Sequence, residues 1–172
     1  GRTTCPTCEG GRLRPESSYV KINGKTIPDL VDLPIDELLD FFNHIQLTDT
    51  EEKVGKRLLI EIKNRLEFMM NVGLSYLTLG RVSSTLSGGE TQRLNLTRTL
   101  GSNLTSSMYI LDEPSIGLHP KDTARLVKVL HALRDLGNTV IVVEHEEDIM
   151  RASDYLVDVG PEAGVHGGSI VF

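Results

Sequence analysis

A serine, two glycines and a glutamate occupy residues 87–90, directly before a stretch with helical character. Ser87 and Glu90 have the spacing of a capping box, in which the serine starts a helix and the glutamate bonds back to it. Gly88 and Gly89 carry no β-carbon, so a phosphate can approach the first N–H groups of that helix closely. An ordinary helix start is the simpler interpretation of Ser-Gly-Gly by itself. The acids further along the chain favour a phosphate-binding turn.

Two pairs of polar residues come directly after two apolar runs. Asp112 and Glu113 follow the first run, and Glu144 and His145 follow the second. Because the carboxyl ends of neighbouring parallel strands open into one crevice, we expect these side chains to share it. Asp112 would hold Mg²⁺ through its water shell, Glu113 would activate an attacking water, and His145 would touch the terminal phosphate. A single acid at a strand end is usually a capping residue, but both pairs together favour nucleotide hydrolysis.

The two apolar runs, residues 108–111 and 139–143, are nearly continuous rather than alternating. Such runs are typical of parallel strands that are covered on both faces. Residues 122–136 between them have helical spacing, and Gly137 is placed to end the helix, which predicts a strand, helix, strand unit with a right-handed crossover. Two more elements are expected after it: a short helix over residues 146–152 and a third strand over residues 155–159.

The preceding part of the chain predicts a β-hairpin followed by helices. Residues 18–22 alternate like a strand, Asn23 and Gly24 favour a type I′ turn, and residues 25–27 can return. A short helix is expected over residues 34–41.

A longer helix is expected to reach about residue 71, and Thr48 and Glu51 can form a capping box at its start. Its apolar residues fall on one face, which predicts core packing, and its basic residues fall on the other. The basic face is usually a solvated surface, and contact with DNA or a partner is the alternative. The apolar set is Val54, Leu58, Leu59, Ile62, Leu66, Met69 and Met70, and the basic set is Lys53, Lys56, Arg57 and Lys63.

The two cysteines of the chain stand close together as Cys5 and Cys8. A Cys-x-x-Cys pair supplies two of the four ligands of a tetrahedral zinc site, so the other two ligands would come from elsewhere. A reduced dithiol or a redox motif is the alternative, although no strand precedes the pair.

Composition bounds the remaining possibilities. The chain has 172 residues, of which 39% are hydrophobic, and a formal net charge of −6, which fits one domain or a domain with a satellite. We expect two parts, residues 1–85 and 86–172. An acidic chain has no overall attraction to nucleic acid, so any DNA contact needs a local basic face. The sequence lacks a bilayer-spanning run and an apolar leader, and we expect a cytoplasmic protein without membrane contact.

Four stretches resemble the ABC ATPase superfamily. Residues 86–90 resemble its signature motif, residues 109–114 its Walker B strand, residues 115–119 its D-loop and His145 its switch histidine. Nearly the whole chain resembles the UvrA family, the damage-recognition ATPases of bacterial nucleotide excision repair. Residues 114–119 are similar to the first of that family's two nucleotide-binding halves.

The resemblance implies an α/β fold: the C-terminal part of an ABC-type, RecA-like nucleotide-binding domain with parallel strands, preceded by a mainly helical signature subdomain with a β-hairpin. It implies that Glu113 and His145 are catalytic and that Asp112 assists Mg²⁺ through water. The signature turn would contact the γ-phosphate of an ATP held by the other half. The implied nucleotide-binding set is Ser87, Gly88, Gly89, Glu90, Asp112, Ser115 and Gly117.

The implied metals and partners follow from the same family. Cys5 and Cys8 would ligate a structural Zn²⁺. The implied partners are damaged double-stranded DNA, UvrB and a second copy that forms a homodimer, and the implied compartment is the cytoplasm.

The chain lacks the Walker A loop that grips a nucleotide. Its only Gly-Lys-Thr, at residues 24–26, has Tyr19 where that loop needs glycine. We therefore expect these residues alone to bind ATP poorly. Thr91, Asn95 and Thr97 depart from the expected signature helix, which is compatible with a UvrA-like paralogue in drug tolerance. An ABC transporter's nucleotide-binding subunit and a non-catalytic binding module are the two rival functions from different classes of protein.

Overall fold

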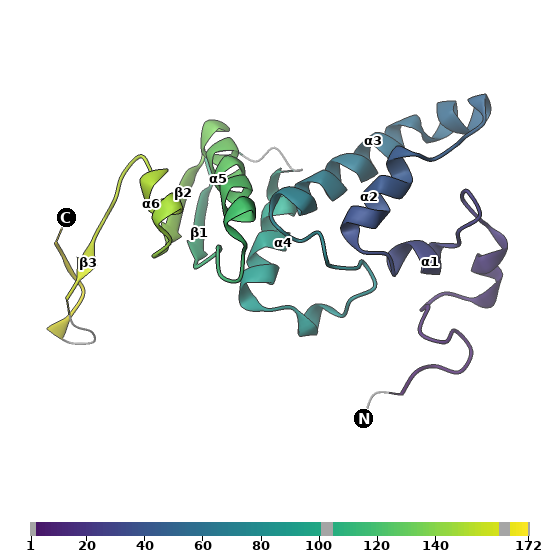
Figure 1. Ribbon diagram of the computed structural model, residues 1–172, viewed down its shortest axis with the longest axis horizontal. Coiled ribbons are helices and arrows are strands. Elements are labelled where there is room, and N and C mark those ends of the chain that lie inside the picture. Colours follow the sequence, from purple (N-terminus) through teal and green to yellow (C-terminus); the bar gives the residue numbers. More distant parts are fainter. Residues whose placement is uncertain (1–2, 101–104, 162–165, 172) are drawn as a thin grey trace.

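The computed structural model describes residues 3–100, 105–161 and 166–171. Helices form one end of the molecule, and a parallel strand pair with its covering helix lies beside them (Figure 1). None of the helices in these ranges is long and apolar enough to cross a membrane. In chain order the elements are η1 (Pro15–Tyr19), α1 (Ile27–Val31), α2 (Ile35–Asn43), α3 (Asp49–Asn71), η2 (Ser83–Thr85), α4 (Gly88–Leu100), β1 (Met108–Asp112), α5 (Pro120–Asp135), β2 (Thr139–Val143), α6 (Glu147–Arg151), β3 (Val159–Gly160) and β4 (Ser169–Ile170).

Helices α2 and α3 pack together and form the core of the first part. Pro34 precedes α2, as predicted, although the helix continues to Asn43. The capping box that starts α3 is confirmed, because the Thr48 N–H donates to the Glu51 carboxylate at 2.9 Å. The buried core of this part consists of Leu30, Ile35, Leu38, Phe42, Leu66, Met69, Val72, Leu74, Leu77 and, from α5, Val129.

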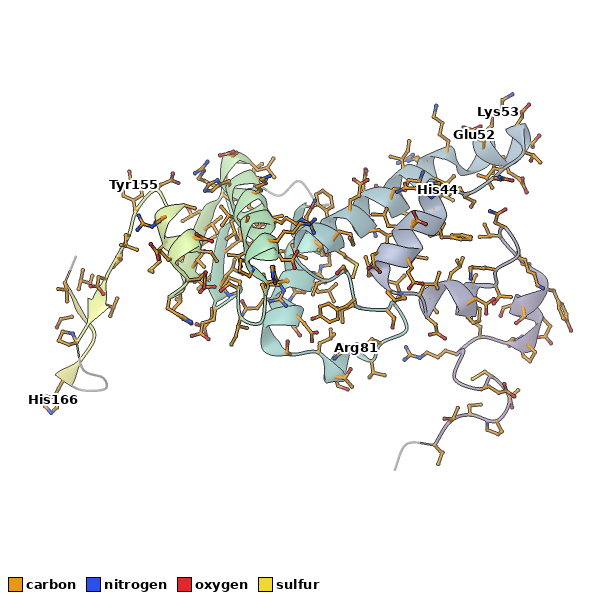
Figure 2. All side chains as sticks on the ribbon, viewed as in Figure 1. His44, Glu52, Lys53, Arg81, Tyr155 and His166 are labelled. Carbon is orange, nitrogen blue, oxygen red and sulfur yellow. The ribbon has the colours of Figure 1, made fainter. Side chains whose placement is uncertain are left out.

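Helix α3 packs into that core from Leu59 onward. Leu66 and Met69 are buried, whereas Val54 is 78% exposed and Leu58 is 67% exposed. The free end of the helix projects past α2, and Figure 2 shows Glu52 and Lys53 at its tip. The prediction of core packing along the whole apolar face is therefore wrong at Val54 and Leu58. Periodicity defines a face but does not supply the element that covers it.

The predicted hairpin is present only as a turn. Ile22 and Lys25 exchange backbone hydrogen bonds of 2.8 and 3.0 Å, and Asn23 and Gly24 adopt the positive φ angles of 48° and 81° that a type I′ turn requires. No strand flanks the turn, because residues 15–19 form η1 and Ile27 begins α1. The strand prediction is wrong, since an exposed segment without a packed face has nothing to hold a ladder.

The parallel strand pair is confirmed. β1 pairs with β2 in a register that places Met108 beside Thr139 and Asp112 beside Val143. Helix α5 connects them, begins two residues earlier than predicted, and packs against one face of the pair. The core on that face consists of Leu96, Leu111, Leu126, Leu130, Leu133 and Ile149.

The opposite face of the β1–β2 pair lies open among the described residues. Ile110 is 68% exposed and Met108 is 63% exposed, and Ile141 and Val143 of β2 are exposed beside them. The prediction that both faces are covered is therefore not met by the residues that the structure describes. We call this surface the open sheet face, defined by Met108, Ile110, Ile141 and Val143.

The third predicted strand, over residues 155–159, is wrong in its position. Tyr155 is exposed and outside any strand, and the strand begins only at Val159. β3 pairs antiparallel with β4 in a separate two-stranded ladder, not with the β1–β2 pair. This ladder stands away from the rest of the described chain (Figure 1), so it does not extend the parallel pair. The short helix before it, α6, is confirmed.

Candidate functional site

The turn before α4 forms the predicted capping box. The Ser87 N–H donates to the Glu90 carboxylate at 2.7 Å, and the Glu90 N–H donates to the Ser87 hydroxyl at 3.2 Å. The helix then continues, because the Thr91 N–H donates to the Ser87 carbonyl at 3.0 Å. This geometry leaves the N–H end of α4 at the surface, where Ser87 and Gly88 are both exposed.

Glu90 is buried and held from several sides. The Tyr76 hydroxyl donates to its Oε1 at 2.5 Å, and Arg81 lies 3.8 Å from the same oxygen. Hydrogen bonds from Tyr76 and Ser87 hold the pKa of Glu90 below its ordinary value. Because both carboxylate oxygens are engaged by protein donors, the contacts favour a structural role over the nucleotide contact that the resemblance implies.

The two glycines of the turn differ in their surroundings. A β-carbon on Gly88 would meet nothing within 4 Å among the described atoms. A β-carbon on Gly89 would lie 2.9 Å from Cγ2 of Ile116 and 3.1 Å from Nη1 of Arg93. The space beside Gly88 is therefore open. At Gly89 the absence of a side chain lets the loop that follows β1 pack close to α4.

The two polar pairs lie at the same edge of the strand pair, as predicted. The Glu113 N–H donates to the Val143 carbonyl at 2.9 Å, which continues the ladder beyond β1. The His145 Nδ1 atom lies 3.6 Å from Glu113 Oε1, and both side chains are at least partly exposed. Asp112 is exposed beside them, and its N–H donates to Gln92 of α4 at 3.3 Å. The edge thus presents two acids and an imidazole to solvent.

Glu113 has an unusual backbone for its residue type. Its φ angle is 45°, in the left-handed region that favours glycine or asparagine. Such a conformation is unfavourable by about 1 kcal/mol or more, and it persists where neighbouring contacts hold it. Strained residues of this kind gather at functional sites, which agrees with the chemistry expected of Glu113.

The β1–α5 loop, residues 113–119, is held by the side chains of Arg93 and Glu144, to which the sequence assigned no such role. Nη1 of Arg93 donates to the Pro114 carbonyl at 2.9 Å and to the Ile116 carbonyl at 3.3 Å. The Ser115 N–H donates to Glu144 at 2.8 Å. Gly117 has a φ angle of 75° and open space around it. A nucleotide contact by Ser115 or Gly117 stays a prediction.

The cysteine pair lies on a turn near the N-terminus. The Glu9 N–H donates to the Cys5 carbonyl at 2.9 Å, and the Gly11 N–H donates to the Cys8 carbonyl at 2.7 Å. Hydrogen bonds from Cys8 and Thr7 lower the pKa of the Cys5 thiol, which favours the thiolate that a metal needs. Both thiols are free, and within the described residues no third metal-binding side chain joins them. The pair fits two ligands of a zinc site and no more.

Comparison with known proteins identifies homologues of this chain. No family model matches the chain. UvrABC system protein A of Methanothermobacter thermautotrophicus is 54% identical over 167 residues, which are 97% of this chain. The same protein of Escherichia coli strain K12 is 52% identical over 167 residues. The chain is homologous to part of UvrABC system protein A. It spans 17% of the length of the Methanothermobacter relative and 18% of the Escherichia relative.

A solved structure agrees with this homology. UvrA2 from Deinococcus radiodurans superposes with a TM-score of 0.85 and 40% identity, and the match covers 98% of this chain and 22% of UvrA2. The UvrA match therefore includes the helical part and the cysteine turn as well as the signature and acid motifs. The superposition confirms the expected mixed α/β fold with parallel strands. The expected hairpin strands are the exception.

Proposed function

We propose that this chain is the part of a UvrA-type ATPase that supplies the signature turn, the Walker B acids and the switch histidine to ATP binding and hydrolysis. The exposed N–H end of α4 at Gly88 would receive the γ-phosphate of an ATP bound by another part of the protein. The division into a helical signature part, residues 1–85, and an ATPase part, residues 86–172, belongs to the same proposal.

The observation that carries this proposal is the pairing of Glu113 with His145 at 3.6 Å across the ends of two parallel strands. Glu113 would accept a proton from the attacking water, and His145 would orient toward the developing charge. Exposed Asp112 beside them offers the oxygen ligand that Mg²⁺ prefers. When bound, ATP would supply the phosphoanhydride bond, and Mg²⁺ would neutralise charge on its phosphates.

The open sheet face supports a larger assembly around this site. Two strands with four exposed apolar side chains on one face are poorly stable alone. We infer that another segment of the full-length protein packs there and completes the nucleotide site.

The repair role and its partners follow from the relatives. We infer that the full-length protein acts on damaged DNA with UvrB, as a homodimer in the cytoplasm, and that Cys5 and Cys8 hold a structural zinc. Identity of 52 to 55% with UvrABC system protein A, against 40% with UvrA2, favours the repair branch over the paralogue. The match over residues that include the cysteine turn disfavours a transporter subunit.

Substitution of the proposed base tests the function. In the full-length protein with its other nucleotide site silenced, Glu113→Gln should lower the ATP turnover rate by about 100-fold or more, because a general base contributes that much. Binding of a non-hydrolysable ATP analogue should remain.

Glu61→Gln on α3 is the matched control, because it makes the same chemical change at an exposed position paired with Arg65. It should leave turnover unchanged. If Glu113→Gln also leaves turnover unchanged, the chain is a binding module rather than a catalytic part.

A further inference from the structure

Buried Arg93 of α4 binds the β1–α5 loop through hydrogen bonds. Arg93 is 2% exposed and lies under the loop. One of its nitrogens donates to the carbonyls of both Pro114 and Ile116. The absent side chain of Gly89 leaves the room for this contact, since a β-carbon there would lie 3.1 Å from the same nitrogen.

The same loop is also held by a carboxylate from the end of β2. Oε1 of Glu144 accepts the Ser115 N–H at 2.8 Å, and Oε2 accepts the N–H of the adjacent His145 at 3.2 Å. One side chain therefore bridges the loop after β1 and the loop after β2. Partial burial by itself would raise the pKa of Glu144, but the hydrogen bonds from Ser115, His145 and Glu146 outweigh it and lower the pKa, so the acceptor is ionised at neutral pH.

The hydrogen bonds from Arg93 and to Glu144 lie next to Glu113, whose backbone is strained. The loop bends directly after this residue, where the Ile116 N–H donates back to the Glu113 carbonyl at 3.1 Å. A residue with a φ angle of 45° needs neighbours that fix it. The carboxylate of Glu144 fixes both Ser115, two residues beyond Glu113, and His145, the residue that faces Glu113.

We propose that Glu144 is a positioning residue, which sets Glu113 against His145 by holding the two loops at a fixed separation. Arg93 supports the loop from below. This inference rests on the proposed ATPase function and assigns to Glu144 a role distinct from that of the reacting groups. A displacement of about 1 Å at a catalytic group lowers a rate by roughly 100-fold.

Two substitutions of Glu144 test the proposal in the full-length protein with its other nucleotide site silenced. Glu144→Ala removes both acceptors and should lower kcat about 10- to 100-fold while KM changes by less than about twofold. Glu144→Gln keeps an acceptor for the Ser115 N–H and should restore kcat to within about fivefold of the parent. Glu61→Gln again serves as the exposed control.

Three results would overturn the proposal: an unchanged kcat in Glu144→Ala, a rise in KM without a fall in kcat, or equal losses in the alanine and glutamine variants. The last result would mean that the charge acts in the reaction rather than by holding the loops. The Glu113→Gln variant separates these outcomes from failure of the proposed function. If Glu113→Gln abolishes turnover and Glu144→Ala does not, only the positioning role is lost.

Discussion

The two glycines of the signature turn should respond in opposite ways to the same substitution. Neither has a positive φ angle, so alanine is compatible with the backbone at both positions. In Gly89→Ala the new β-carbon would stand 2.9 Å from Cγ2 of Ile116, and that atom must retreat by about 0.6 Å to reach an ordinary contact distance of about 3.5 Å. Ile116 is β-branched and its carbonyl is bound to Arg93, so the loop must move with it.

Overpacking of this kind reduces stability by about 1 to 3 kcal/mol, and we expect the lower half of that range because Ile116 is 56% exposed. A loss of about 1 to 2 kcal/mol corresponds to a roughly 5- to 30-fold larger population of the open loop. Gly88→Ala meets open space, so its local stability should stay unchanged or rise by up to about 1 kcal/mol.

Hydrogen exchange measured by mass spectrometry on the full-length protein resolves both effects. Peptides from α4 and from residues 113–119 should exchange faster in Gly89→Ala and not in Gly88→Ala. Peptides from α3 serve as the internal control and should be unaffected. Equal exchange in the two variants would show that the Gly89–Ile116 contact does not constrain the loop.

Two further substitutions probe the connection between the helical part and the site. Tyr76→Phe removes the hydrogen bond to Glu90 and should reduce stability by about 1 kcal/mol at pH 7. The pKa of Glu90 is lowered in the folded protein, so ionised Glu90 stabilises the fold above the ordinary pKa of 4.5. This stabilisation is lost as the pH falls through the lowered pKa. The difference in thermal midpoint between parent and variant should therefore shrink below pH 4.5. A difference that is constant with pH would contradict this. Gly73→Ala places a β-carbon 2.6 Å from Leu118 at a φ angle of 72° and should reduce stability by about 2 to 4 kcal/mol; an unchanged thermal midpoint would refute the close packing of these two segments.

Local signals in the sequence predicted local structure well. The capping boxes at Thr48 and Ser87 depend only on residues three positions apart, and both form as expected. The edge shared by Glu113 and His145 follows from two apolar runs and the geometry of parallel strands. These features need no knowledge of the distant packing partner.

Features that depend on a partner were not predictable. Val54 and Ile110 have the spacing of core residues, yet no described element covers them. The Asn23–Gly24 turn forms without its strands, because a turn preference does not provide a sheet to extend. Arg93 looks like an ordinary helix-surface residue in the sequence, and only the fold shows it buried beneath Pro114.

The open sheet face lies on the same two strands that lead into Glu113 and His145. Any element that settles there touches the backs of both strands at once. A small tilt of that element would therefore move acid and imidazole in concert, so the fit of a distant surface would set how well the proposed base meets the attacking water.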